Sequence, residues 1–137
     1  MSYSRTIQIE FNHCDPAGIV FYPRYFEMTN SVVENFFADE VGKSFAQMHM
    51  EGMNNGVPTV HITADFMAPS RLGDKVLFTL VVRKLGGSSV EVEITGWLGD
   101  ELRLRANLTL VWIDKMKAAR WPDALRARLA AHLEAQE

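Results

Sequence analysis

The sequence predicts a single α+β domain in which one long helix packs against an antiparallel sheet. Three observations lead to this fold class. An alternating segment and a long helical segment occupy residues 5–42, further alternating segments fill most of residues 57–112, and a helical segment ends the chain. Consecutive strands joined by short turns favour antiparallel pairs, and a sheet can cover the apolar face of a helix. A chain of 137 residues suits one domain, so we expect residues 1–137 to form it.

The first strand and the long helix lie in the N-terminal third. We expect the strand over residues 5–13. Its apolar residues, which alternate with polar ones, are Ile7, Ile9 and Phe11. From Tyr22 the apolar spacing changes to three and four residues, which predicts a helix as far as Val41. Pro23 suits the first turn, where a helix needs no N–H group, and Gly42 is a suitable stop.

The rest of the chain is mostly strand. A short methionine-rich helix or loop is expected over residues 43–53. The strands are expected over residues 57–69, 74–85, 90–98 and 102–112. The apolar residues that share one face within a strand are Val60, Ile62, Ala64 and Phe66; Val90, Val92 and Ile94; and Leu102, Leu104, Ala106, Leu108, Leu110 and Trp112. A final helix carries a stripe formed by Leu125, Leu129 and Leu133.

One strand segment also predicts association between chains. We expect residues 90–97, "VEVEITGW", to lie at an exposed edge of the sheet. An exposed edge presents unpaired N–H and C=O groups that need a partner or protection. The sequence therefore predicts a homo-oligomer, and it leaves open whether two or four chains assemble.

Composition and charge exclude several classes of protein. The chain is 47% hydrophobic and 23% charged, and its net charge of −3 argues against a protein that binds the nucleic-acid backbone. Cys14 is the single cysteine, so no intramolecular disulfide can form, and the four histidines show no metal-ligand spacing. The first residues lack the apolar core of a signal peptide and no apolar run is long enough for a membrane span. We expect a cytoplasmic protein that does not act at a membrane.

The most specific stretch is "HCDPAGIVFYPRYF", residues 13–26, between the first strand and the long helix. Asp15 is the carboxylate inside this junction. Pro16 biases Asp15 toward an extended backbone, and Gly18 permits a turn that other residues resist. A carboxylate so placed can attack a carbonyl carbon or deprotonate water, and it can also serve as a turn or helix-cap aspartate. We favour the catalytic interpretation because of the motif that surrounds Asp15.

This motif, together with the order of elements, resembles the hydroxybenzoyl-coenzyme A thioesterase family of the hotdog fold. The family signature is an acid, then Pro-Ala-Gly, two apolar residues, and an aromatic residue followed by Tyr-Pro; "DPAGIVFYP" is similar to it. The resemblance implies a sheet wrapped around the helix, dimers or dimers of dimers joined edge to edge, and active sites between subunits. It implies an acyl-CoA substrate, with no metal or redox cofactor.

The resemblance also implies roles for individual residues. Asp15 is the expected nucleophile or general base, and Gly18 is the expected turn residue beside it. The backbone N–H of Tyr22 is the expected donor to the oxyanion, because the first N–H groups of a helix have no intrahelical acceptors. Asn30 takes the position of an acid in the hydroxybenzoyl-specific enzyme, and Leu85 that of a tryptophan. These departures predict a different acyl group.

Further residues are expected to bind substrate. The candidates are Asn30, His61, Arg83, Lys84, Ser88 and Ser89. The last four belong to "RKLGGSSVEV", a turn whose cations and hydroxyls suit the phosphates of the coenzyme, although an ordinary hairpin with solvated charges explains it equally well. Asn30 can also be an exposed helix residue. The acyl pocket is expected among Phe26, Met28, Val33, Phe37, Met48, Met50 and Met53.

Three functions remain open at this point. The favoured one is hydrolysis of an acyl-CoA thioester to free acid and CoA. A non-catalytic acyl-CoA binding or regulatory module is the alternative, but binding alone does not need the Asp15 carboxylate. A dehydratase usually needs a histidine base beside an acid, and His13 is poorly placed for that. The sequence does not specify the acyl group, the route taken by Asp15, or whether CoA or a carrier protein bears the thioester.

Overall fold

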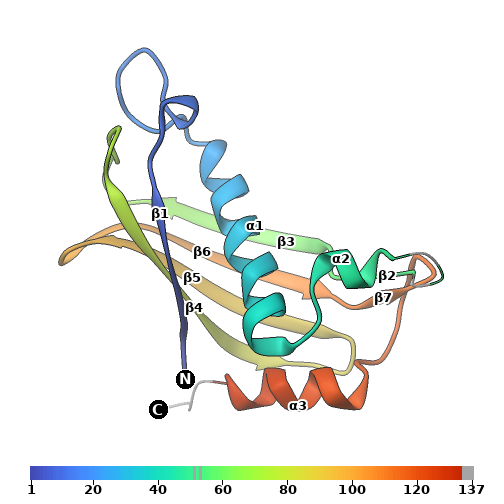
Figure 1. Ribbon diagram of the computed structural model, residues 1–137. Helices are drawn as coiled ribbons and strands as arrows, with labels where there is room; N and C mark the ends of the chain where they lie inside the picture. Colours follow the sequence, from blue (N-terminus) through green and yellow to red (C-terminus); the bar gives the residue numbers. More distant parts are fainter. Residues whose placement is uncertain (51, 53, 134–137) are drawn as a thin grey trace.

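The computed structural model describes residues 1–50, 52 and 54–133. Its main strands are β1 (Tyr3–Gln8), β3 (Thr59–Phe66), β4 (Lys75–Leu85), β5 (Ser89–Leu98) and β6 (Glu101–Val111). Its helices are α1 (Arg24–Phe36), α2 (Phe45–Met48) and α3 (Asp123–Ala131), with single turns η1 (Phe11–His13) and η2 (Phe37–Val41). The short strands β2 (Asn55–Gly56), β7 (Ile113–Asp114) and β8 (Lys117–Ala118) form a separate small sheet. Figure 1 shows α1 lying across one face of the large sheet, which confirms the expected α+β class.

The five long strands form one antiparallel sheet in the order β1-β4-β5-β6-β3. The expectation that residues 90–97 lie at an edge is wrong, because β5 pairs with β4 on one side and with β6 on the other. Glu91 and Glu93, which alternate with the buried residues of β5, face away from the core. The edge strands are β1 and β3, and β3 pairs with β6 and not with β4, the strand that follows it in sequence.

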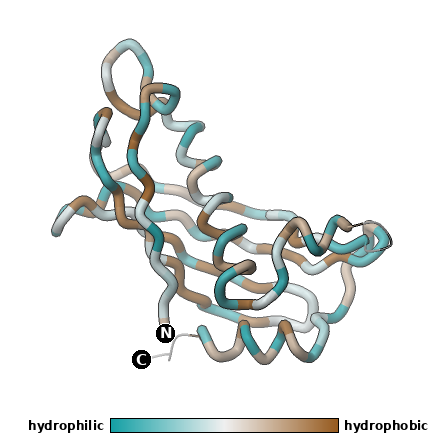
Figure 2. Tube along the Cα trace, in the orientation of Figure 1, coloured by the Kyte–Doolittle hydropathy of each residue, from teal (hydrophilic) through white to brown (hydrophobic). Residues whose placement is uncertain are grey.

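The core lies between α1 and the sheet. Figure 2 shows hydrophobic and hydrophilic residues alternating along the strands, as the sequence predicts for a sheet with one covered face. The buried residues of α1 are Tyr25, Met28, Thr29, Val32, Val33 and Phe36. The expected inward residues Val90, Val92 and Ile94 are buried, and each such side chain contributes about 1.5–3 kcal/mol to folding.

The long helix begins and ends close to the expected residues. The Arg24 N–H donates to the Phe21 carbonyl at 2.8 Å, so residues 21–23 form a turn that leads into α1. The turn η2 extends the helix to Val41 with π-helical geometry, and Gly42 follows with φ of 91°. The Gly42 N–H donates to the Phe37 carbonyl, which closes the helix end. The stop at Gly42 is thus confirmed.

Phe11 departs from the expected strand. The strand ends at Gln8, residues 11–13 form the 3-10 turn η1, and the Phe11 side chain is 85% exposed. The Glu10 N–H donates to His13 Nδ1 at 2.8 Å, a local contact that favours the turn over a continued strand. The alternation of apolar residues did not reveal this contact, so the prediction that the strand continues through Phe11 was wrong.

The strand β3 is largely exposed, and Ala64 is its one half-buried residue. Val60, Ile62 and Phe66, which the sequence places on one apolar face, are 60%, 38% and 44% exposed.

In the described part of the chain, no helix is long and apolar enough to cross a membrane.

Candidate functional site

Asp15 lies in a tight hairpin between β1 and α1. The Asp15 N–H donates to the Ile19 carbonyl at 3.0 Å, and the Gly18 N–H donates to the Asp15 carbonyl at 2.9 Å. Gly18 has φ of 80°, a conformation that favours glycine, so its expected role as a turn residue has a geometric basis. The half-buried Asp15 carboxylate accepts the Ala17 N–H at Oδ1, at 2.9 Å. Asp15 therefore holds its own turn with one oxygen.

The Tyr22 backbone lies between this hairpin and α1. The Phe21 N–H donates to the His13 carbonyl at 2.9 Å, and the Arg24 N–H donates to the Phe21 carbonyl. Pro23 has no N–H group. Among the described residues, no carbonyl or side chain accepts the Tyr22 N–H. This donor stands just before a helix whose N-terminal end carries positive partial charge, so it can bind an anionic oxygen.

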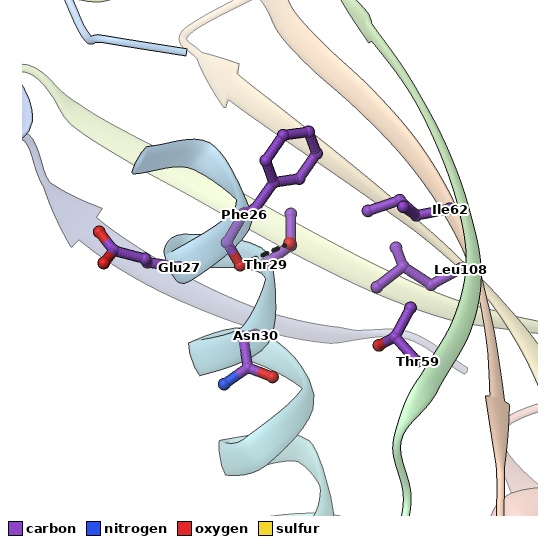
Figure 3. Close-up of a pocket in the computed structure, with 7 residues that line it drawn as sticks. All are labelled: Phe26, Glu27, Thr29, Asn30, Thr59, Ile62 and Leu108. Atoms are coloured by element: carbon purple, nitrogen blue, oxygen red, sulfur yellow. Dashed lines mark hydrogen bonds between the residues drawn. The ribbon is translucent and has the colours of Figure 1, made fainter. Parts of the chain in front are cut away.

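A cavity of about 480 Å³ lies between α1 and the edge strand β3. It is lined by Phe26, Glu27, Thr29, Asn30, Thr59, Ile62 and Leu108. Figure 3 shows Phe26 and Thr29 of α1 on one side and Ile62, Leu108 and Thr59 on the other, while Glu27 points away from β3. The Thr29 hydroxyl is occupied, because it donates to the Phe26 carbonyl at 3.1 Å. The cavity is mostly apolar and offers few polar groups for orientation.

An aromatic cluster joins this cavity to the Asp15 hairpin. The Phe66 ring, at the end of β3, lies 5.5 Å from the Tyr25 ring, 5.9 Å from that of Tyr22 and 6.3 Å from that of Phe26. The Tyr25 ring stacks on Phe66 and the other two meet it edge to face. The cluster holds Tyr22 against the end of β3, next to the cavity.

The structure places Asn30 at this cavity, on the exposed side of α1. Asn30 and Thr59 also line a second hollow of about 330 Å³ that continues toward Ile113 and Met116. Among the expected acyl-pocket residues, Phe26 lines the first cavity, whereas Met28, Val33, Phe37 and Met48 are buried in the core. Met50 is exposed, and Met53 lies outside the described residues.

His61 and Arg83 come together at a different place. Both line a hollow of about 230 Å³ on the face of the sheet opposite α1, which Glu91 also lines. His61 follows Val60 and precedes Ile62, so its side chain faces away from the cavity that Ile62 lines. Arg83 Nη2 lies 2.8 Å from Glu93 Oε1, so this cation is already paired within the chain.

The turn that contains Ser88 and Ser89 lies at the opposite end of the sheet from Asp15, beside α3 (Figure 1). Its carbonyls are occupied. Gly86 accepts from Arg126 Nη1 at 2.7 Å, Gly87 from the Trp121 N–H, Ser88 from the Trp112 N–H and Ser89 from Trp121 Nε1. Lys84 is exposed. Within one chain, Lys84 and this turn do not meet the Asp15 hairpin, and the contacts of the turn are structural.

Sequence reasoning missed several residues around the cavity. Thr59, Ile62 and Leu108 line it, and Phe66 closes the aromatic cluster beside it. The period-two pattern of residues 60–66 was the available signal, but it predicted only that these residues share one face of a strand. The described residues contain no group of three or more His, Cys, Asp or Glu side chains that could hold a metal ion.

This arrangement is the hotdog fold. An antiparallel sheet surrounds one long helix, and a hairpin that carries the Asp15 carboxylate precedes the helix. Solved structures support this. A thioesterase superfamily protein from Jannaschia sp. CCS1 superimposes with a TM-score of 0.89 at 20% identity, covering 98% of this chain and 94% of that one. A 1,4-dihydroxy-2-naphthoyl-CoA thioesterase from Synechocystis gives a TM-score of 0.84 at 21% identity, covering 95% and 96%.

Sequence comparison identifies the family. Residues 36–104 match the Thioesterase superfamily, and the chain belongs to this family. It is 30% identical over 86 residues to the 4-hydroxybenzoyl-CoA thioesterase of Pseudomonas sp. (strain CBS-3), covering 61% of this chain. It is 29% identical over 93 residues to the 1,4-dihydroxy-2-naphthoyl-CoA hydrolase of Nostoc punctiforme (strain ATCC 29133 / PCC 73102), covering 66% of this chain. The chain spans 61% and 59% of the lengths of these two relatives.

Proposed function

We propose that this protein hydrolyses an acyl-CoA thioester to a free acid and CoA. The observation that carries the proposal is the unaccepted Tyr22 N–H at the start of α1, in the same segment as the Asp15 carboxylate. Membership of the Thioesterase superfamily and the CoA thioesters named in both curated relatives support it.

The single cysteine, Cys14, rules out an internal disulfide and supports a reducing compartment such as the cytoplasm.

Asp15 supplies the reacting carboxylate. One oxygen is held by the Ala17 N–H, which fixes the orientation of the group, and the other has no hydrogen-bond partner among the described residues. In the nucleophilic route this second oxygen bonds to the thioester carbon, the C–S bond breaks, and CoA leaves as a thiolate that takes a proton. Water then cleaves the mixed anhydride. In the general-base route the carboxylate removes a proton from the attacking water.

The Tyr22 N–H stabilises the negative charge on the carbonyl oxygen in either route. The donor has no competing acceptor, so it needs no rearrangement when the charge develops. A side-chain substitution at Tyr22 leaves this donor in place. The acyl group would lie in the cavity between α1 and β3, with Asn30 and Thr59 as its polar contacts.

We propose a second copy of the chain as the partner that completes the site. The edge strand β3 is exposed along both faces and carries Val60, Ile62 and Phe66 uncovered. Pairing of two β3 strands would satisfy the unpaired edge, extend the sheet and bury these side chains. It would also cover the cavity, one wall of which is β3.

Release of free thiol from a panel of aromatic, short-chain and long-chain acyl-CoA thioesters tests the activity. Asp15→Asn is the informative variant, because its amide oxygen can still accept the Ala17 N–H while the negative charge is lost. We expect kcat to fall by about 100-fold or more with an unchanged melting temperature. Asp100→Ala, in the exposed turn between β5 and β6, is the control and should retain wild-type activity. Thiol release that survives Asp15→Asn would refute the assigned role of Asp15.

A further inference from the structure

The Asp15 hairpin is supported by the loop of residues 69–74, which connects β3 to β4. The Val20 N–H, after the hairpin, donates to the Ser70 carbonyl at 2.9 Å. The Ile9 N–H, before the hairpin, donates to the Asp74 carbonyl at 2.7 Å, and the Gly73 N–H donates back to the Ile9 carbonyl at 2.8 Å. Both ends of the segment that carries Asp15 are therefore fastened to one loop.

This loop is in turn held by the side chain of Arg103 in β6. Arg103 Nη1 lies within hydrogen-bond distance of the Pro69 carbonyl (2.9 Å), Ser70 Oγ (3.1 Å) and Asp74 Oδ2 (3.0 Å). Its Nε lies 2.6 Å from Glu101 Oε1 as an ion pair. Arg103 and Ser70 are both buried. One nitrogen of the guanidinium, Nη1, thus contacts three positions of the loop, while Nε of the same group pairs with Glu101.

Asp74 completes the arrangement. Its Oδ2 also accepts the Arg71 N–H at 2.9 Å, so one carboxylate oxygen joins the loop backbone to Arg103. The Arg71 N–H bond, together with the Arg103 guanidinium, holds the pKa of Asp74 below its usual value despite partial burial. Asp74 is therefore kept as the anion that the guanidinium needs, and the pair stays formed.

We propose that Arg103 is a positioning residue of the thioesterase site, which fixes the Asp15 carboxylate and the Tyr22 N–H relative to each other through the loop 69–74. This inference rests on the proposed function. Arg103 makes none of its described contacts to Asp15 or Tyr22, so it acts only through the loop. The hairpin projects from the end of the sheet (Figure 1), which makes its base the place where its position is set.

The test compares Arg103→Met with Arg105→Met. Arg105 lies two residues along the same strand and pairs with Glu93, 3.8 Å away, without a contact to the loop. We expect Arg103→Met to lower kcat about 100-fold with little change in KM, because a small displacement of reacting groups is sufficient for such a loss. Arg103→Lys, which keeps the charge, should lose about tenfold, and Arg105→Met should leave kcat unchanged. Equal losses in Arg103→Met and Arg105→Met would overturn the proposal.

Two further measurements separate positioning from general destabilisation. Asp15→Asn should lower kcat by a much smaller factor in the Arg103→Met background than in the wild type, because a displaced carboxylate contributes less to catalysis. Amide hydrogen exchange at Ile9 and Val20 should accelerate in Arg103→Met and not in Arg105→Met. If Arg103→Met does not fold, Arg103→Lys and Asp74→Asn can be compared with Arg105→Met in its place.

Amide hydrogen exchange also separates failure of this inference from failure of the proposed function. If the wild type releases no thiol from any acyl-CoA, the proposed function fails, and exchange at Ile9 and Val20 still tests whether Arg103 holds the hairpin. Unchanged exchange and unchanged kcat in folded Arg103→Met would refute the role of Arg103 while leaving the thioesterase assignment intact.

Discussion

Asp15 lies in the turn that its sequence context predicts, and its reactive role is the proposed one. One oxygen closes the turn through the Ala17 N–H, and Gly18 adopts the positive φ that the turn requires. Sequence reasoning treated turn aspartate and reactive carboxylate as alternatives, and the two roles are compatible in one side chain. The free Tyr22 N–H could not be read from residue types, because it depends on where every nearby carbonyl points.

Tyr3 carries a prediction at the same scale. Burial, followed by the hydrogen bond that its hydroxyl donates to Asp39 at 2.6 Å, raises the pKa of Tyr3 to about 12 from 10.0. Folding therefore favours the neutral phenol. The resulting stability is fully present below pH 10 and is lost as pH rises to about 12. The loss amounts to roughly 3 kcal/mol.

Urea unfolding of the wild type and of Tyr3→Phe across this alkaline window measures the effect. Tyr3→Phe has no hydroxyl to ionise, so its free energy of unfolding should fall less steeply than that of the wild type. Parallel pH profiles for the two proteins would show that Tyr3 does not control the alkaline loss of stability.

Among the elements, β3 has the most consequence for function, because it is an edge strand and also a wall of the cavity. Its alternation of apolar and polar residues predicts a strand with Val60, Ile62, Ala64 and Phe66 on one face. A register shift between Thr59 and His61 interrupts this alternation at Val60, and Val60, Ile62 and Phe66 remain exposed within one chain. A period-two pattern reports which residues share a face and does not report what covers that face.

Val60 tests the proposed pairing of β3 strands. Val60→Lys places a charge at an exposed position of this strand, outside the cavity lining. We expect the variant to form far less dimer than the wild type by light scattering after size-exclusion chromatography, because charge on an edge strand opposes strand pairing. Leu72→Lys, the same kind of apolar-to-charged change at an exposed loop residue, is the control. A Val60→Lys protein that stays as oligomeric as the wild type would exclude β3 as the interface.

At the scale of the whole molecule, α3 closes the end of the sheet opposite the Asp15 hairpin. Trp121, just before α3, is buried, and its ring lies 5.7 Å from that of Trp112 and 6.3 Å from that of Phe37. Its N–H groups donate to the Gly87 and Ser89 carbonyls. The turn at residues 86–89 is therefore a junction between the sheet and the C-terminal helix.

Trp121→Ala should lower the free energy of unfolding by about 3–5 kcal/mol, the usual cost of removing a large buried aromatic side chain. Trp121→Phe keeps most of the apolar contact and should cost less. Chemical denaturation measures both values. A loss below about 1 kcal/mol for Trp121→Ala would mean that the end of the sheet repacks without this side chain.

The amino-acid sequence by itself determined the order of elements, the extent of the long helix, the turn at Gly18 and the carboxylate at the start of the helix. These features depend on local periodicity, on glycine and proline geometry, and on the motif around Asp15, all of which act within a few residues. Only the tertiary structure decided that β5 is central and β3 is an edge, that the 86–89 turn is far from Asp15, and that Arg103 supports the hairpin. Strand order, strand edges and buried ion pairs depend on residues distant in the chain, and local patterns carry no information about those pairings.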